Sequence, residues 1–316
     1  MDYHEELNSS KIKRENSENK EKTGNYKFEI SSKRINRRIL LNNVLQKVFS
    51  LSTVFALLVL GLLFYRIAMD AKGWIDFQFL TSNLSIFAEK AGIKGAIIGT
   101  IWLMVIVAPI TMSIGVVTAI YLEEYAKKNK FTAFLKVNIS NLAGVPSVIF
   151  GLLGLTVFGR LMNLGSSILA GGLTMSLLVL PIIVVSSQEA LKSVPSYMKE
   201  ASYAIGADKW TTIRRVVLPV ALPGILTGSI LSLSRAIGET APLVVLGIPT
   251  LIMKYPTSAL DNFTALPIQI YYWTLDAVLT REYANLAAAT IVVLLAILFL
   301  MNSIAILIRN KFQKRY

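Results

Sequence analysis

The chain has no cysteine and a single histidine, His4, among its 316 residues. The lack of thiols excludes disulfides, thiolate metal sites, iron–sulfur clusters and cysteine nucleophiles. One histidine in a polar N-terminal stretch argues against a histidine metal site and against a serine–histidine triad. No GxxxxGK[ST] sequence occurs, so the chain has no such loop to cradle nucleotide phosphates. We therefore predict a chain with no catalytic residue, metal or cofactor of its own, in which any ATP is bound by a partner subunit.

Charged side chains are also scarce, and apolar ones take their place. Only 16% of the residues are charged and 54% are hydrophobic, with a mean hydropathy of +0.57. A soluble globular chain of this size would not show these values. The net charge of +13 does not indicate a nucleic-acid partner, because the basic residues lie between apolar runs rather than in one patch. The composition predicts a membrane protein with several spans.

Six apolar stretches approach or exceed the roughly 20 residues that cross a bilayer. They are residues 48–65, 95–122, 137–159, 161–188, 220–246 and 283–308. A short turn near residues 163–167 separates the third stretch from the fourth. The sequence therefore predicts an all-α membrane protein with six transmembrane helices.

The positions of lysine and arginine predict the orientation of these spans. Of the 32 basic residues, 24 fall in the two tails and the two loops on one side, and 7 fall on the other side. Lysine and arginine concentrate on the cytosolic side of membrane proteins. We expect a multi-pass protein of the cell membrane with both termini in the cytosol.

The charge pattern also divides the chain along its length. We expect a largely disordered cytosolic tail over 1–43, a first transmembrane helix over 44–66, a transmembrane core over 93–308 with a cytosolic loop at 190–219, and a basic cytosolic tail over 309–316. The basic stretch Lys33–Lys47 fits either a segment lying on anionic lipid headgroups or a simple topology determinant.

The loop between the fourth and fifth stretches has the signals of a helical hairpin. Gly206 suits the left-handed residue that ends a helix, and Asp208 suits the cap of the next helix. That second helix is expected to stop before Pro219. The pattern predicts a short helix, a glycine corner and a second short helix facing the cytosol.

A charged pair interrupts the fifth stretch. Arg235 cannot lose its proton, and a charge in mid-membrane costs about 2.5 to 3.5 kcal/mol on insertion scales. Glu239 lies four residues later, where it can neutralise Arg235. We interpret Arg235, Glu239 and Thr240 as a substrate pathway, in which Arg235 meets an anionic substrate and Thr240 supplies a hydroxyl. The alternative is an ion pair that only locks helices together.

The hairpin resembles the EAA loop of binding-protein-dependent ABC importer permeases. The resemblance rests on the spacing of Glu200, Ala201, Ser202, Gly206, Ala207, Leu218 and Pro219. It departs from the family pattern at Ser202, where alanine is usual, and at Val216, where isoleucine is usual. In that family the loop is the coupling helix that docks on the ATPase subunit, so the resemblance implies the same role here. The alternative is an ordinary hairpin between two spans.

A second, narrower resemblance covers roughly residues 95–308. ALPGILTGSILSLSRAIGETAPL, NLAGVPSVIFGLLGL and IYLEEYA are similar to phosphate ABC transporter permeases of the PstA type. This resemblance implies the type I ABC importer transmembrane fold and transport of inorganic phosphate by alternating access. It also implies a sister permease that forms a heterodimer with this chain, two ATPase subunits and an extracytoplasmic phosphate-binding protein.

Other functions stay open at this stage. Sulfate or molybdate are tetrahedral oxyanions that one arginine can also recognise. An ion-coupled secondary transporter also places an arginine and a glutamate in the membrane, although it needs no EAA-like loop. A noncatalytic membrane anchor needs neither Arg235 nor Glu239.

Overall fold

The computed structural model describes residues 32–249, 252 and 255–312, in two units, residues 1–63 and 64–316. Each unit is described by itself. The predicted tail up to residue 31, with His4, and the last four residues of the predicted basic tail lie outside the described residues.

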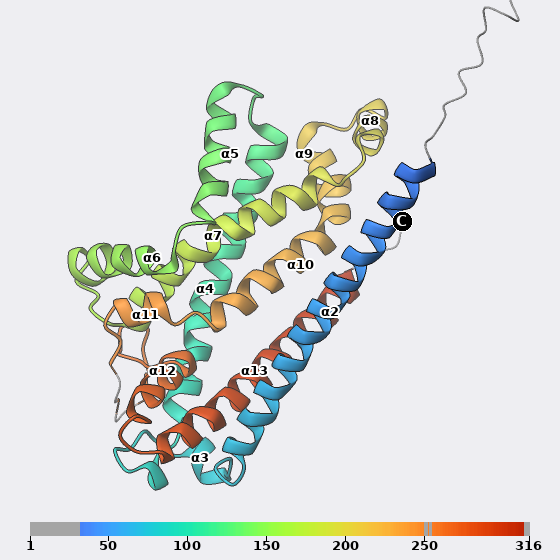
Figure 1. Ribbon diagram of the computed structural model, residues 1–316. Helices are drawn as coiled ribbons and strands as arrows, with labels where there is room; N and C mark the ends of the chain where they lie inside the picture. Colours follow the sequence, from blue (N-terminus) through green and yellow to red (C-terminus); the bar gives the residue numbers. More distant parts are fainter. Residues whose placement is uncertain (1–31, 250–251, 253–254, 313–316) are drawn as a thin grey trace, which may run out of the picture. The chain divides into compact units, whose positions relative to one another are not determined.

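Helices make up the fold of the described residues, which confirms the all-α prediction (Figure 1). The helices are α2 (Ser32–Ala71), α3 (Phe77–Thr81), α4 (Lys94–Ile120), α5 (Lys130–Leu142), α6 (Ser147–Leu153), α7 (Ile168–Lys192), α8 (Ser196–Ala204), α9 (Lys209–Thr212), α10 (Leu218–Ile237), α11 (Ala241–Val245), α12 (Leu266–Asp276) and α13 (Glu282–Phe312). Three π-helical segments, Tyr121–Tyr125, Gly154–Leu161 and Ile213–Val217, extend or join them. The only β-type pairing in the described residues is an isolated bridge between Ser167 and Asn262.

Five helices in the described part of the chain are long and apolar enough to cross a membrane. The predicted third span is instead a pair of helices, Lys130–Leu142 and Ser147–Leu161, bent by 102°. The bend follows from Pro146, because the residue before a proline is disfavoured in the helical conformation. The pair is either one broken span, which gives the predicted six, or a re-entrant loop.

The helix after the glycine corner begins at its predicted cap, Asp208, but differs from the prediction in two other respects. It does not stop before Pro219 but runs from Lys209 to Ile237. Proline has no N–H and its ring crowds the carbonyl four residues earlier, and the wider π-helical turn Ile213–Val217 lets the helix continue past it. The same helix ends at Ile237 rather than near residue 246, and the short helix α11 follows.

Helix α7 forms the centre of unit 64–316, and α4 and α10 pack against it. Small residues bring α10 close to α7, since a Cβ added to Gly228 would come within 2.6 Å of the Ser186 side chain. At the other side of the core, Phe150 of α6 and Leu243 of α11 are buried in the same apolar cluster. The bent pair and the interrupted fifth span are therefore packed against each other.

The start of α7 is held by the segment that precedes α12. The backbone N–H groups of Ile168 and Leu169 donate to the carbonyls of Asp261 and Ala259, at 3.1 and 2.8 Å. These bonds satisfy donors that a helix N-terminus leaves without partners.

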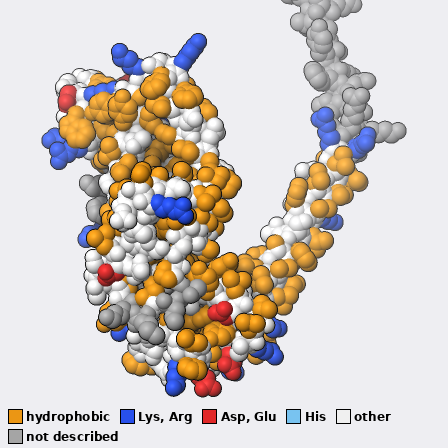
Figure 2. Space-filling model, turned by 90° about the vertical axis from the view of Figure 1, so that its left-hand side faces the viewer, with side chains coloured by type: hydrophobic (Ala, Val, Ile, Leu, Met, Phe, Trp, Pro, Cys, Tyr) orange, Lys and Arg blue, Asp and Glu red, His pale blue; other side chains and the backbone are white. Residues whose placement is uncertain are grey.

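The surface of unit 64–316 fits a membrane setting. Hydrophobic side chains cover much of the face in Figure 2, and most charged side chains lie toward its two ends. In membrane proteins the loops that carry lysine and arginine lie outside the bilayer, so this distribution of charge agrees with a multi-pass protein.

Candidate functional site

Arg235 and Glu239 form an ion pair at the end of α10. The Arg235 Nε and the Glu239 Oε1 lie 3.2 Å apart. The predicted pairing is present, but Glu239 lies beyond the helix, which ends at Ile237 with Gly238 as its cap. A tight turn holds Glu239 in place, because its N–H donates to the Ala236 carbonyl at 3.2 Å.

The Arg235 side chain points away from the core of its own chain. It is 62% exposed, whereas its neighbours Ala236 and Ile237 are buried. On the same turn of α10, the Ser234 hydroxyl bonds Asn302 of α13. The arginine therefore lies on an outer face of the chain, at a point where neighbouring side chains hold the helix firmly.

Thr240 is the third predicted pathway residue and lies in the same turn. Its hydroxyl donates to the Gly238 carbonyl at 3.5 Å, a long hydrogen bond that leaves the group able to accept another partner. Pro242, two residues after Thr240, packs on α6, where a Cβ added to Gly151 would come within 2.8 Å of the Pro242 Cα. The structure thus brings Arg235, Glu239 and Thr240 together at one helix break.

The second candidate site is the Gly206 hairpin, by which we mean α8, α9 and the residues between them. Gly206 has a φ of +85°, the left-handed conformation that the sequence predicts. Asp208 caps α9 by accepting from the Thr211 N–H at 3.1 Å. The Thr211 hydroxyl and backbone N–H also hold the pKa of Asp208 below its usual value, because both stabilise the ionised carboxylate.

Ser202, which departs from the family pattern, has a specific partner. Its hydroxyl lies 2.9 Å from the Thr212 hydroxyl, and both side chains are buried between α8 and α9. An alanine at 202 would leave the Thr212 hydroxyl without this bond. The serine therefore ties the two arms of the hairpin together.

The other predicted coupling residues divide by exposure. Glu200, Ala201 and Gly206 are exposed, while Ala207, Leu218 and Pro219 are half-buried. The hairpin also exposes the large apolar side chains of Ile205 and Trp210. Its tip is thus an apolar surface beside a carboxylate, a composition suited to contact with another protein.

One helix connects the two candidate sites. The Gly206 hairpin leads into the helix that runs from Lys209 to Ile237, and Arg235 lies in its last turn. At about 1.5 Å per residue, the two sites are roughly 40 Å apart along that helix. A displacement of the hairpin therefore acts directly on the helix that carries Arg235.

Sequence reasoning missed a set of polar contacts at the end of α4. Glu123 and Glu124, in the π-helical segment after α4, form ion pairs with Lys136 and Lys199. Two adjacent glutamates where an apolar run ends, on the side with most of the basic residues, were the available signal.

Comparison with known proteins decides the family. The sequence profile of the family described as "Binding-protein-dependent transport system inner membrane component" matches residues 112–315. The chain belongs to this family. It is therefore a membrane subunit of a binding-protein-dependent transport system, and the resemblance of its hairpin to the EAA loop is consistent with that membership.

Relatives of known name are similar to this permease over most of its length. The "Phosphate transport system permease protein PstA" of Mycobacterium leprae is 34% identical over 82% of this chain and 86% of its own. "Phosphate transport system permease protein PstA 1" of Mycobacterium tuberculosis is 35% identical over 74% of this chain and 77% of its own. The "Probable ABC transporter permease protein YqgI" of Bacillus subtilis is 35% identical over 61% of this chain and 65% of its own. These matches confirm the resemblance to permeases of the PstA type.

Solved structures of ABC transporters share the fold of this permease. A bacterial alginate ABC transporter, in complex with an alginate-bound periplasmic protein, has a chain that superposes with a TM-score of 0.59 at 15% identity, over 88% of this chain and 96% of that chain. An inward-facing methionine transporter, MetNI, has a chain that superposes with a TM-score of 0.55 at 18% identity, over 68% of this chain and 94% of that chain. The fold is that of type I ABC importer transmembrane subunits.

Proposed function

We propose that this permease is a membrane subunit of an ATP-driven importer that moves inorganic phosphate across the cell membrane, with both termini in the cytosol. The observation that carries the proposal is the similarity to proteins named as phosphate transport permeases, over most of their length. The geometry of the two candidate sites supplies a physical account of how such a subunit works.

The chemistry of Arg235 suits a transient phosphate contact. A guanidinium presents several N–H donors in a plane that matches two phosphate oxygens. In the structure the guanidinium is paired with Glu239, with 3.2 Å between the Arg235 Nε and the Glu239 Oε1. Phosphate competes with the Glu239 carboxylate for the Arg235 guanidinium, and this competition weakens phosphate binding. The Arg235–Glu239 pair forms again when phosphate is released. Thr240 supplies a further hydroxyl in the same turn.

The exposure of Arg235 supports a pathway that lies between two membrane subunits. An arginine that is 62% exposed at the end of an apolar helix is costly against lipid. A second permease packed on this face would enclose the charge in a polar passage. We therefore propose the heterodimer with a sister permease that the resemblance implies.

The Gly206 hairpin is the proposed contact with the ATPase. Its exposed residues Glu200, Ile205 and Trp210 provide one charge and a large apolar area. Two ATPase subunits would then serve the two permeases, and ATP would be bound and hydrolysed there rather than in this chain. An extracytoplasmic phosphate-binding protein would deliver the substrate on the opposite side.

Transport follows from these contacts by alternating access. Closure of the ATPase on ATP displaces the hairpin, and the helix Lys209–Ile237 carries that displacement to the Arg235 turn. The pathway opens outward, accepts phosphate from the binding protein and returns to the inward state after hydrolysis.

Arg235→Ala in the full complex, reconstituted into liposomes, tests the substrate contact. A hydrogen bond to a charged group contributes about 1.5 to 3 kcal/mol, so we expect phosphate uptake to fall roughly tenfold or more. Arg235→Lys keeps the charge but loses the planar fork, and we expect intermediate uptake. Wild-type uptake by Arg235→Ala, with normal assembly, contradicts the role in the pathway.

A further inference from the structure

The segment Tyr121–Tyr125, sequence YLEEY, joins three separate elements at the end of α4. Three of its consecutive side chains, Glu123, Glu124 and Tyr125, each contact a lysine from a different helix. We call this π-helical segment with its three lysines the YLEEY hub. The lysines are Lys136 of α5, Lys199 of α8 and Lys209 of α9.

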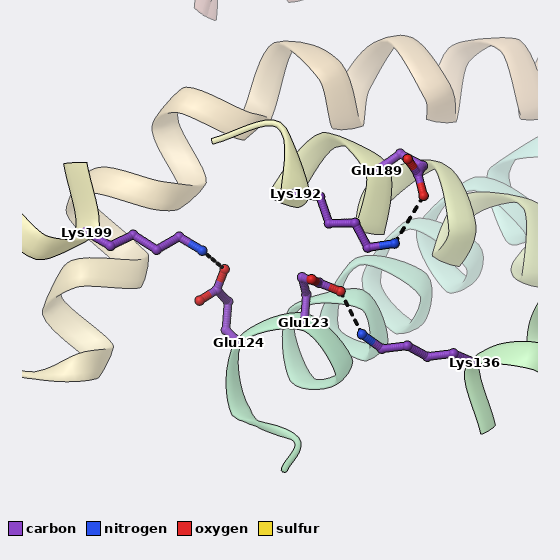
Figure 3. Close-up of polar contacts among 6 residues, drawn as sticks. All are labelled: Glu123, Glu124, Lys136, Glu189, Lys192 and Lys199. Carbon is purple, nitrogen blue, oxygen red and sulfur yellow. Dashed lines mark hydrogen bonds and ion pairs between the residues drawn. The ribbon is translucent and has the colours of Figure 1, made fainter. Parts of the chain in front are cut away.

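The ion pair between Glu124 and Lys199 is the most enclosed contact of the hub. The Glu124 Oε1 and the Lys199 Nζ lie 2.6 Å apart, and the Glu124 side chain is only 7% exposed. Figure 3 shows the Lys199 side chain reaching from α8 to this carboxylate. Because Lys199 lies on the first arm of the Gly206 hairpin, this pair attaches the hairpin to the end of α4.

The two other contacts attach the segment to α5 and to the second arm of the Gly206 hairpin. The Glu123 Oε2 lies 2.8 Å from the Lys136 Nζ, which ties the segment to α5 (Figure 3). The Lys209 Nζ lies 4.9 Å from the centre of the Tyr125 ring, a cation–π contact with the second arm of the hairpin. Adjacent residues therefore hold α5 and both arms of the hairpin.

The hub is anchored on packed apolar side chains. Leu122, in the same segment, is buried in a cluster with Ala119 of α4, Leu191 of α7 and Val217 at the start of α10. The polar contacts are thus supported by a packed apolar layer to which three of the long apolar helices contribute.

We propose that the YLEEY hub makes the Gly206 hairpin, the end of α4 and α5 move as one body, and that the Glu124–Lys199 pair is the positioning contact that couples ATPase closure to these helices. The inference rests on the proposed function, because the hairpin must be the ATPase contact for its movement to matter. It assigns to Glu124 and Lys199 a role in transmission, with no contact to phosphate or ATP.

The Glu124–Lys199 pair is partly buried, since the Glu124 side chain is 7% and the Lys199 side chain 24% exposed, and loss of one partner leaves the other charge unpaired where water solvates it poorly. In Glu124→Gln or Lys199→Met, the first arm of the hairpin therefore loses its attachment to the end of α4, and each ATPase cycle moves α4 and α5 less. The chain offers a matched control in Glu189 and Lys192, which pair at 3.2 Å within α7 but are 68% and 45% exposed (Figure 3). An exposed pair of this kind contributes little.

The test measures phosphate imported per ATP hydrolysed by the reconstituted full complex. We expect Glu124→Gln and Lys199→Met to lower this ratio about fivefold, within the range by which residues in coupling networks change coupling. The exchange of charges in Glu124→Lys with Lys199→Glu restores most of the ratio, and Glu189→Gln leaves it at the wild-type value. A wild-type ratio in both single variants overturns the proposal. Loss of assembly in every hub variant, with a normal ratio in the assembled fraction, also overturns it, since the pair would then be structural only.

A second measurement does not depend on the transported solute. Spin labels at the exposed positions Ile205, on the hairpin, and Phe134, on α5, report the distance between these two elements. We expect one narrow distance distribution in wild type with and without ATP, and a broad one in Glu124→Gln. If the wild-type protein imports no phosphate but gives the narrow distance distribution, the proposed function fails and the hub remains. If the wild-type distance distribution is broad, the hub proposal fails.

Discussion

At the scale of single residues, the Arg235–Glu239 pair could be predicted from the sequence, whereas its setting could not. A spacing of four residues predicts contact on a helix, and the two side chains do pair. The helix nevertheless ends at Ile237, and a turn held by Ala236 places Glu239. Beyond the Gly238 cap, α11 packs against α6, a contact that a local pattern does not contain.

The cap of α9 gives a prediction about pH. The pKa of Asp208 is lowered in the folded hairpin by the Thr211 hydroxyl and N–H, so its stabilising effect is present above the usual aspartate pKa and is lost as the pH falls through the lower, folded value. We expect hydrogen exchange of residues 209–213 to accelerate as the pH drops from neutral into that acid range. Asp208→Asn retains a capping oxygen without the titrating group. The exchange rates are corrected for their intrinsic pH dependence. If they then change equally in wild type and in Asp208→Asn, the role of Asp208 is contradicted.

At the scale of helices and turns, glycine and proline predicted where the chain turns but not always how. Gly206 and the turn at residues 163–167 were predicted, and the structure has positive φ values at Gly206, Asn163 and Gly165. Pro219 was expected to end a helix, and a π-helical turn accommodates it instead. The 102° bend before Pro146 was missed, because an apolar run long enough to span a membrane outweighed its proline.

Substitution of Gly206 tests the corner of the hairpin. An added Cβ meets no atom within 4 Å, so the cost comes from the backbone alone. A side chain in the left-handed region costs roughly 1 to 2 kcal/mol. We expect Gly206→Val to weaken assembly with the ATPase and its stimulation, and Gly206→Asn, which tolerates this conformation better, to retain both. Normal assembly and stimulation in Gly206→Val contradict the docking role.

At the scale of the whole molecule, the order of the apolar helices could be predicted, and five of the six expected spans are long apolar helices, because bilayer thickness sets the length that a span needs. The contacts of the YLEEY hub could not, because they join residues far apart in the sequence, 75 positions in the case of the Glu124–Lys199 pair. The family assignment came from motifs along the chain, and the profile match over residues 112–315 confirms it.

The orientation of the chain can be tested without removing any native thiol, since the sequence has no cysteine. Ile205 and Leu279 are 87% and 88% exposed, on the hairpin and between α12 and α13. We expect a cysteine at position 279 to react with an impermeant thiol reagent outside intact cells, and a cysteine at position 205 to react only after permeabilisation. The opposite pattern would place the hairpin outside, beyond the reach of an ATPase.

The most direct test of the central claim is uptake of labelled phosphate by liposomes that contain the full complex, with ATP supplied on the side of the hairpin. We predict uptake that requires ATP and the binding protein, is not reduced by excess sulfate or molybdate, and falls in Arg235→Ala. ATP-driven uptake of sulfate or molybdate in place of phosphate, or phosphate uptake that continues without ATP, would contradict the account.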